Sequence, residues 1–178
     1  MTSFYQANAL ARLYSGKAWW KAVYQQVFPY FKKAKRLPGT HQLQNLGVDK
    51  ILRTEAGKDI FLEEKFDRTT YDNFFLEYIS NLEKETPGWL VKPVLTDYLA
   101  YVRLGMGKCY FIPFPPLQMA WLEHGDRWLA EYGPKTAGTY RNGGFLYDTV
   151  GCCVPMTEVL SKVHATIIDI SEYLPEVI

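Results

Sequence analysis

The stretch VDKILRTEAGKDIFLEEKF (residues 48–66) decides the fold that the sequence predicts. Its outer parts, VDKILRT (48–54) and DIFLEEKF (59–66), combine β-branched and aromatic residues in short runs that are typical of strands. Between them, EAG (55–57) has the length of a three-residue hairpin loop, in which Gly57 supplies the left-handed conformation. The stretch therefore predicts an antiparallel β-hairpin.

The second strand of this hairpin carries charges in the middle of an apolar run. Because side chains alternate along a strand, Glu63 and Lys65 share one face, while Glu64 lies on the other face with Leu62 and Phe66. Burying an unpaired charge is costly. The charged side chains therefore require partners.

Asp49 is the predicted partner across the hairpin. If Thr54 pairs with Lys58 around the loop, counting back along both strands sets Asp49 opposite Glu63, with Cβ atoms roughly 5 Å apart. Carboxylates this close repel each other unless a cation lies between them. A loop one residue longer or shorter would put Glu64 in the place of Glu63.

Two carboxylates and a main-chain carbonyl are oxygen ligands of the kind that Mg²⁺ prefers, and Mn²⁺ accepts the same type of site. We therefore expect a metal ion bound by the side chains of Asp49 and Glu63 and by the main-chain carbonyl of Glu64. Lys65, on the same face as Glu63, would place or activate the attacking water. This set suits metal-assisted hydrolysis of a phosphodiester bond.

These residues resemble the signature of the PD-(D/E)XK nuclease superfamily, an acidic residue on one strand followed by (Asp/Glu)-x-Lys on the next. In GVDKIL (47–52), Asp49 matches the first acidic residue. In IFLEEKF (60–66), Glu63 and Lys65 match the E-x-K. The resemblance implies a restriction-endonuclease-like fold and a metal-dependent deoxyribonuclease, with Asp49, Glu63 and Lys65 as the catalytic residues.

Flanking segments extend the resemblance. The lead-in Gln44-x-x-Gly47-x-Asp49 is similar to that of several members, and later segments look like a phage-associated subgroup, namely FFLEYISN (74–81), PGW (87–89) and TDYLAYV (96–102). This likeness implies a role in phage or prophage DNA metabolism. The chain departs from the pattern in its first predicted helix, because residues 3–35 contain no Asp or Glu that could serve as a further metal ligand.

Two polar residues near the motif are second-shell candidates. Glu77, within a helix predicted over 71–82, is placed either to orient Lys65 or a metal-bound water, or simply in solvent. Gln44 is either a bonding partner of a phosphate, a water or a catalytic carboxylate, or a turn residue.

A basic cluster ends the first predicted helix. It consists of Lys32, Lys33, Lys35 and Arg36. These cations are DNA-binding candidates through phosphate contacts. Their position is equally explained by the preference for positive charge at a helix C-terminus.

The remaining segments predict elements around the hairpin. Helices are expected over 3–35, with breaks near Ser15-Gly16 and at Pro29, and over 71–82, 117–133 and 156–164; a short helix feeding a strand over 92–104; and strands over 108–114 and 143–156. This order predicts a single nuclease-like domain over residues 1–178. Its class is α/β, at the border with α+β, and a central mixed sheet carries the hairpin between flanking helices.

Composition limits the classes of function. The chain has 178 residues and is 48% hydrophobic, so it is too apolar for a disordered protein. Its formal net charge is +1, so DNA, the expected partner, must meet a local basic surface. The three cysteines, of which Cys152 and Cys153 are adjacent, predict neither a disulfide framework nor a zinc site. We expect a cytoplasmic protein, in a bacterial host cell if a phage encodes it.

The apolar runs are too short to span a membrane, so no membrane partner is expected, while a homo-oligomer stays open. Two other functions also stay open. One is a nuclease fold that binds DNA or protein without catalysis. The other is a viral interaction protein of unrelated α+β fold, in which the charges of residues 63–65 lie on the surface of an ordinary sheet.

Overall fold

The computed structural model describes residues 4–38, 41–141 and 144–174. Within these residues the helices are α1 (Phe4–Tyr14), α2 (Trp20–Val27), α3 (Gln42–Asn45), α4 (Phe114–Tyr132) and α5 (Met156–Leu160), with 3₁₀ turns η1 (Leu104–Met106) and η2 (Ser171–Tyr173). The strands are β1 (Phe31–Arg36), β2 (Lys50–Thr54), β3 (Asp59–Asp67), β4 (Asn73–Asn81), β5 (Thr86–Pro87), β6 (Tyr98–Arg103), β7 (Lys108–Pro113), β8 (Pro134–Arg141), β9 (Gly144–Pro155) and β10 (Thr166–Asp169).

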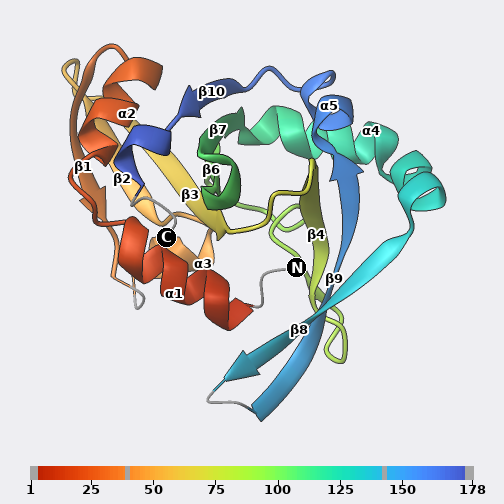
Figure 1. Cartoon of the computed structure of the whole chain (residues 1–178). Coiled ribbons are helices and arrows are strands. Elements are labelled where there is room, and N and C mark those ends of the chain that lie inside the picture. Colours follow the sequence, from red (N-terminus) through yellow and green to blue (C-terminus); the bar gives the residue numbers. More distant parts are fainter. Residues whose placement is uncertain (1–3, 39–40, 142–143, 175–178) are drawn as a thin grey trace.

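Two sheets build the fold (Figure 1). The larger is a curled sheet of six strands in the order β1-β2-β3-β6-β7-β10, and the smaller has four strands in the order β5-β4-β9-β8. In the larger sheet β3 and β6 run parallel, whereas the other neighbours are antiparallel. This arrangement confirms the expected α/β class with a central mixed sheet. The second sheet was not expected from the sequence.

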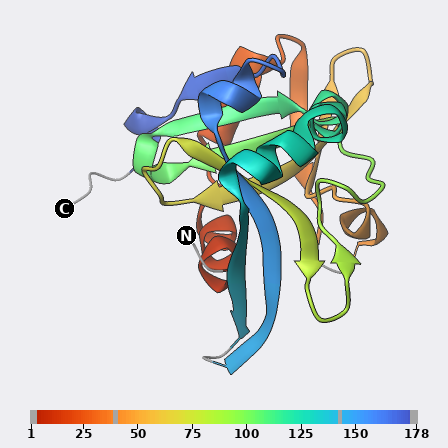
Figure 2. The same cartoon turned by 90° about the vertical axis from the view of Figure 1, so that its right-hand side faces the viewer.

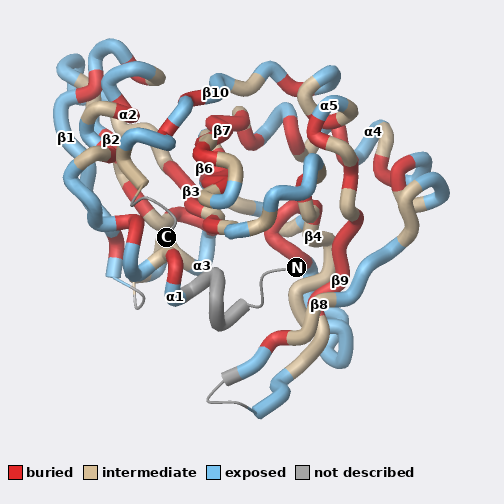
Figure 3. The backbone as a smooth tube through the Cα atoms, viewed as in Figure 1, coloured by how far each residue is buried: buried red, intermediate tan, exposed pale blue. Residues whose placement is uncertain are grey.

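The central strands of the larger sheet are covered on both faces. Alternate residues of β6 belong to two different cores, and Figure 3 shows buried residues along this strand and its neighbours. Ala100 and Val102 pack in the core beneath α1 and α2. Leu99 and Tyr101 pack in the core shared with the second sheet and α4. A charge in the middle of β3, where β3 pairs with β6, therefore points toward protein on either face.

The predicted hairpin forms with the predicted register. β2 and β3 pair antiparallel, with Lys50 opposite Leu62, so one further step sets Asp49 opposite Glu63. At the loop, the Thr54 N–H donates to the carbonyl of Lys58 at 2.9 Å. Gly57 has a φ of 80°, the left-handed conformation that the three-residue loop requires.

One predicted helix and the end of another are strands. Residues 73–81 form β4, because Phe74 and Leu76 alternate with less buried neighbours and pack into the core, whereas the sequence suggested a helix over 71–82. The end of the predicted helix over 3–35 is also wrong, because residues 31–36 form β1 and pair with β2. Tertiary pairing overrides helix propensity in this lysine-rich segment.

Other predictions differ in smaller ways. The breaks near Ser15-Gly16 and at Pro29 are confirmed, because α1 ends at Tyr14 and α2 ends at Val27. No helix precedes β6 within residues 92–97, and the strands β8 and β10 were not predicted. Ser3 and Gly143, at the edges of two predicted elements, lie outside the described residues. Across the parts of the chain that the structure describes, none of the helices has the length and hydropathy needed to cross a membrane.

Candidate functional site

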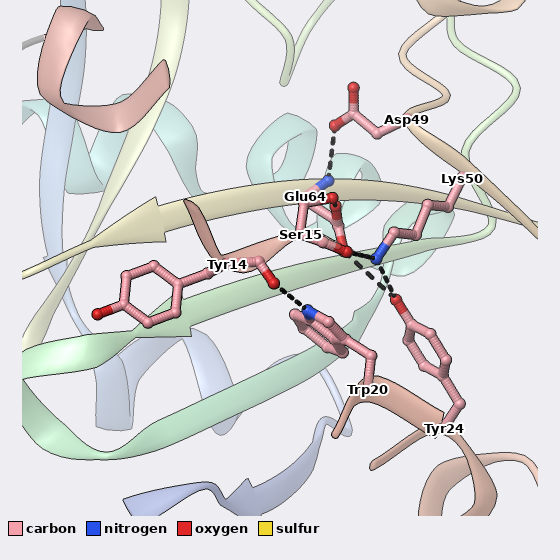
Figure 4. A network of polar contacts seen from close by, with 7 residues as sticks. All are labelled: Tyr14, Ser15, Trp20, Tyr24, Asp49, Lys50 and Glu64. Atoms are coloured by element: carbon pink, nitrogen blue, oxygen red, sulfur yellow. Dashed lines mark hydrogen bonds and ion pairs between the residues drawn. The ribbon is translucent and has the colours of Figure 1, made fainter. Parts of the chain in front are cut away.

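The first predicted site residue, Asp49, lies at the entry of β2 and faces the backbone of β3. Its carboxylate oxygen Oδ2 accepts a hydrogen bond of 2.9 Å from the Glu64 N–H, which Figure 4 shows. The other oxygen, Oδ1, accepts from Gln44 Nε2 at 3.4 Å. Since a carboxylate offers about four lone-pair sites, the two hydrogen bonds orient Asp49 and leave acceptor capacity for another group.

Glu63 and Lys65 form an ion pair on the face that Asp49 shares. The Nζ of Lys65 lies 2.5 Å from Oε1 of Glu63, and the exposed fraction of the side chain is 36% for Lys65 but only 9% for Glu63. The Lys65 ammonium also lies 5.8 Å from the ring centroid of Trp89. The lysine is thus held against an aromatic face and a buried carboxylate, with part of its side chain open to solvent.

The charge around Lys65 is predominantly negative. Burial of Lys65 acts to lower its pKa, but the carboxylates of Glu63, Glu77 and Asp49 act against burial. Together they raise the pKa of Lys65 above its usual value. The ammonium therefore stays protonated at neutral pH, and its positive charge faces three acidic side chains, one of which, Glu77, also interacts with Lys92.

Glu77 approaches this group from the second sheet. It belongs to β4, so its predicted place in a helix is wrong, yet it interacts electrostatically with Lys65 as one of the two alternatives requires. Its Oε1 accepts from the Trp89 N–H at 3.4 Å. Burial raises the pKa of Glu77, and the positive charge of Lys65 opposes this shift. Glu77 is therefore a half-buried neighbour of the site rather than a solvated helix residue.

Gln44 also contacts the site. Besides its hydrogen bond to Asp49, its Nε2 lies 3.5 Å from the carbonyl of Leu37. It sits in the short helix α3, whose start is capped by His41, because His41 Nδ1 accepts from the Leu43 N–H at 3.2 Å. Of the two predicted roles, the structure places Gln44 as a partner of the Asp49 carboxylate.

The turn between α3 and β2 is shaped to receive Glu63. Gly47 has a φ of 76°, and a Cβ atom built on it would lie 2.8 Å from Glu63 Oε2 and 3.0 Å from Val94 Cγ1. The Gly47 carbonyl accepts from the Thr96 hydroxyl at 2.6 Å, which holds the turn against the chain before β6. The absence of a side chain at Gly47 therefore makes room for the Glu63 carboxylate.

We expect Gly47→Ala to lower the free energy of unfolding by about 1–2 kcal/mol from left-handed backbone strain alone, and by more because its Cβ crowds Glu63. Gly57→Ala is the matched control, since Gly57 also has a positive φ but a Cβ there would meet nothing within 4 Å. Urea unfolding of both variants measures the difference. Equal losses of stability would show that the close approach to Glu63 is unimportant.

The opposite face of β3 holds a buried polar network that the sequence did not reveal (Figure 4). Lys50 Nζ lies 2.7 Å from Glu64 Oε1, with exposed side-chain fractions of 4% and 3%. Tyr24 donates to Glu64 Oε1 at 3.3 Å and Ser15 donates to Glu64 Oε2, while Lys50 donates to the Ser15 carbonyl at 2.6 Å and to the Tyr24 hydroxyl at 2.9 Å. Burial raises the pKa of Glu64 and lowers that of Lys50, and the opposite charge of each partner counteracts these shifts.

The sequence contained one signal for this pair. Lys50 lies opposite Leu62 in the hairpin, and Leu62 shares its face with Glu64, so the two charges are diagonal neighbours on one side of the sheet. The Glu64 side chain thus points away from Asp49 and Glu63, as expected, and only its main chain borders the candidate metal site.

The basic residues of β1 form an exposed edge of the larger sheet. Lys32, Lys33, Lys35 and Arg36 are all exposed. Lys35 lies opposite Ile51 and Lys33 opposite Arg53, which places both lysines on the face of Asp49. These cations are therefore not at a helix end. Charged residues on an edge strand also discourage pairing with another sheet, which is sufficient reason for some of them.

A cavity of about 270 Å³ opens beside the Glu63–Lys65 pair. Glu77, Trp89 and Lys92 line it together with residues of the β8–β9 hairpin, which belongs to the same sheet as β4. Among the described residues, no group of three or more His, Cys, Asp or Glu side chains is arranged to hold a metal ion. Comparison of the chain with protein-family models, with curated proteins and with solved structures found no match.

Proposed function

We propose that this protein is a metal-dependent deoxyribonuclease that hydrolyses DNA phosphodiester bonds. The observation that carries this proposal is the pairing of Asp49 with Glu63 on one face of the hairpin, with the Lys65 ammonium 2.5 Å from the Glu63 carboxylate. The proposal agrees with the resemblance of these residues to the PD-(D/E)XK signature. A role in phage or prophage DNA metabolism rests on that resemblance alone.

The residues present fit a divalent cation. Asp49 and Glu63 offer carboxylate oxygens, and Gly47 leaves the space that Glu63 occupies. The Lys65 ammonium faces the carboxylates of Glu63, Glu77 and Asp49, of which Glu77 also interacts with Lys92. The third protein ligand in this proposal is the main-chain carbonyl of Glu64, and water completes the shell, as is usual for Mg²⁺. Mg²⁺ or Mn²⁺ bound there would polarise a phosphoryl oxygen and lower the pKa of a bound water.

The protein's own groups have distinct roles in this proposal. Because its pKa is raised, Lys65 stays protonated and is no general base. It donates hydrogen bonds to the attacking water or offsets the negative charge that develops on the phosphoryl group. Glu77 orients Lys65 from the second sheet, and Gln44 orients Asp49 through its amide.

Asp49→Asn should reduce Mn²⁺ affinity by about 10-fold or more and reduce DNA cleavage by roughly 100-fold, because the variant removes a ligand charge while keeping an oxygen for the Glu64 N–H. Asp59→Asn in the same hairpin is the control, since Asp59 pairs with Arg53 in solvent. Calorimetric titration with Mn²⁺ and cleavage of labelled DNA measure the two effects. Unchanged Mn²⁺ affinity in Asp49→Asn would refute the assignment of the ligand.

The exposed lysines of β1 are proposed to bind phosphates. Lys33→Ala/Lys35→Ala should lower the slope of log Kobs against log salt by about 1.8, since each lost phosphate contact to duplex DNA contributes about 0.9. Lys84→Ala/Lys162→Ala removes the same charge from exposed positions outside β1. Fluorescence anisotropy across a salt series compares the two double variants. Equal slopes would mean that the β1 lysines do not contact phosphates and serve only to discourage the pairing of this edge strand with another sheet.

One observation favours a second function, DNA binding without cleavage. The Glu63 carboxylate is already paired with Lys65, and α1 and α2 supply no further acidic ligand. Incubation of the protein with labelled DNA and Mn²⁺ separates the two functions. Bound but intact DNA at protein excess would support the binding module.

A further inference from the structure

The left-handed turn at Gly47, between α3 and β2, lies against the Glu63 carboxylate. The two oxygens of this carboxylate have different neighbours. Oε1 lies 2.5 Å from Lys65 Nζ, whereas Oε2 would lie 2.8 Å from a Cβ atom on Gly47. Both Gly47 and Glu63 are buried. The carboxylate is therefore held between the lysine on one side and the turn on the other.

The turn is closed by hydrogen bonds of its own backbone. The Val48 N–H donates to the Leu43 carbonyl at 3.1 Å, and the Gly47 N–H donates to the Gln44 carbonyl at 3.0 Å. This pair of bonds is the Schellman motif, which ends a helix where a glycine takes the left-handed conformation. The motif accounts for the end of α3, but neither bond reaches β3, the strand that carries Glu63.

Two consecutive residues before β6 hold the turn from outside. The Leu95 N–H donates to the Leu46 carbonyl at 2.9 Å. The hydroxyl of Thr96, which is only 4% exposed, donates to the Gly47 carbonyl at 2.6 Å. Figure 2 shows α3 beside the chain that leads into β6. The turn is therefore attached to a segment that is distant in the sequence.

The next residue, Asp97, attaches the same segment to β3. Its N–H donates to the carbonyl of Phe61, and its carboxylate oxygen Oδ2 accepts from the Phe61 N–H, both at 2.8 Å. Residues 95–97 thus bridge the turn and the strand of Glu63. This bridge fixes the position of the turn relative to the Glu63 backbone.

Thr96 lies where the turn meets Glu63. Its hydroxyl oxygen would lie 3.0 Å from a Cβ atom on Gly47, close to the place that the Glu63 oxygen also approaches. Loss of the hydroxyl would leave the buried Gly47 carbonyl without this donor, which is costly. The turn would then shift toward another donor. Because the Glu63 carboxylate rests on the turn, its orientation would change as well.

We propose that Thr96 is a positioning residue of the candidate site, which fixes the orientation of the Glu63 carboxylate through the turn at Gly47. The part of this inference that concerns metal binding rests on the proposed function. Thr96 acts through Glu63 and contacts neither metal nor DNA. Loss of an outer partner that orients a ligand typically lowers metal affinity by roughly 10- to 100-fold.

The test compares Thr96→Val, which removes the hydroxyl at similar volume, with Thr149→Val. Thr149 is also buried, and its hydroxyl also donates to a backbone carbonyl, that of Ser80 in the second sheet. In calorimetric titrations Thr96→Val should bind Mn²⁺ about 10-fold more weakly than the wild type, and Thr149→Val should stay within about 2-fold. Thr96→Ser keeps the hydroxyl and should bind Mn²⁺ like the wild type.

A second measurement needs no metal. NMR of isotope-labelled protein follows the exchange of the Lys65 ammonium protons with water, which the ion pair with Glu63 slows. Thr96→Val should speed this exchange by about 5-fold, the scale of one weakened hydrogen bond, whereas Thr96→Ser and Thr149→Val should leave it unchanged. If Thr96→Val does not fold, Thr96→Ala takes its place, because it differs from Thr96→Ser by the hydroxyl alone.

The two measurements separate this inference from the proposed function. Unchanged exchange in Thr96→Val, or an equal change in Thr149→Val, would overturn the positioning role. Equal Mn²⁺ affinity of Thr96→Val and a wild type that binds Mn²⁺ would overturn it too. A wild type that binds no Mn²⁺ would refute the proposed metal site, whereas faster exchange in Thr96→Val alone would still support the positioning of Glu63.

Discussion

Lys65→Ala should reduce the rate of DNA cleavage in Mn²⁺ by roughly 100- to 1,000-fold, the loss seen when one preorganised group that stabilises developing charge is removed. The structure places the Lys65 ammonium 2.5 Å from Glu63, under the influence of the carboxylates of Asp49 and Glu77. Its raised pKa keeps the positive charge in place at the pH of the assay. The rate constant under single-turnover conditions measures the effect without a contribution from product release.

The same variant should bind Mn²⁺ at least as tightly as the wild type, because Glu63 loses its competing cation. Opposite effects on metal affinity and on cleavage distinguish a charge-stabilising lysine from one that only holds the fold. Lys58→Ala is the control, since Lys58 is exposed in the loop of the same hairpin. Cleavage by Lys65→Ala at the rate of Lys58→Ala would exclude the proposed catalytic role.

Lys50→Ala should lower the free energy of unfolding by about 3–5 kcal/mol, because it leaves the Glu64 carboxylate buried without its cation. The side chains of Lys50 and Glu64 are 4% and 3% exposed, so water replaces little of the lost interaction. Arg53→Ala is the matched control in the same strand. It breaks a solvent-exposed pair with Asp59 and should change the stability far less than Lys50→Ala does.

A double variant shows whether the cost belongs to the uncompensated charge. Lys50→Met/Glu64→Leu removes both charges with similar volume and should recover most of the stability that Lys50→Ala loses. Urea unfolding monitored by circular dichroism measures all of these variants. If the double variant is as unstable as Lys50→Ala, the network contributes through its hydrogen bonds to Ser15 and Tyr24 rather than through charge compensation.

The local part of the fold was predictable from the sequence because local chemistry determines it. The length of the loop at 55–57 and the glycine at its end set the pairing of Thr54 with Lys58, and that register follows along both strands to Asp49 and Glu63. The helix α4 was likewise predicted, over 117–133, and it ends beside Gly133, which has a φ of 70°. In each case residues close in sequence carry the information.

The rest depends on contacts between distant segments. The sequence of β4, NFFLEYISN, fits a helix and a strand about equally, and only its pairing with β9 decides between them. Lys50 was missed as the partner of Glu64 because Lys50 lies directly opposite Leu62, and Glu64 is only its diagonal neighbour across the hairpin. Glu77 was included as a candidate although its element was wrong, since β4 brings it to Lys65 from the second sheet.

Glu64 connects the two faces of the larger sheet, because its main chain contacts one face and its side chain the other. Its N–H holds the Asp49 carboxylate on one face, and its side chain holds Ser15 and Tyr24, from the end of α1 and from α2, on the other. Local opening of the helical layer would therefore release the residue that orients Asp49. We therefore expect the candidate site and the N-terminal helices to be coupled through Glu64, so that loss of the packing of α1 and α2 would loosen the site.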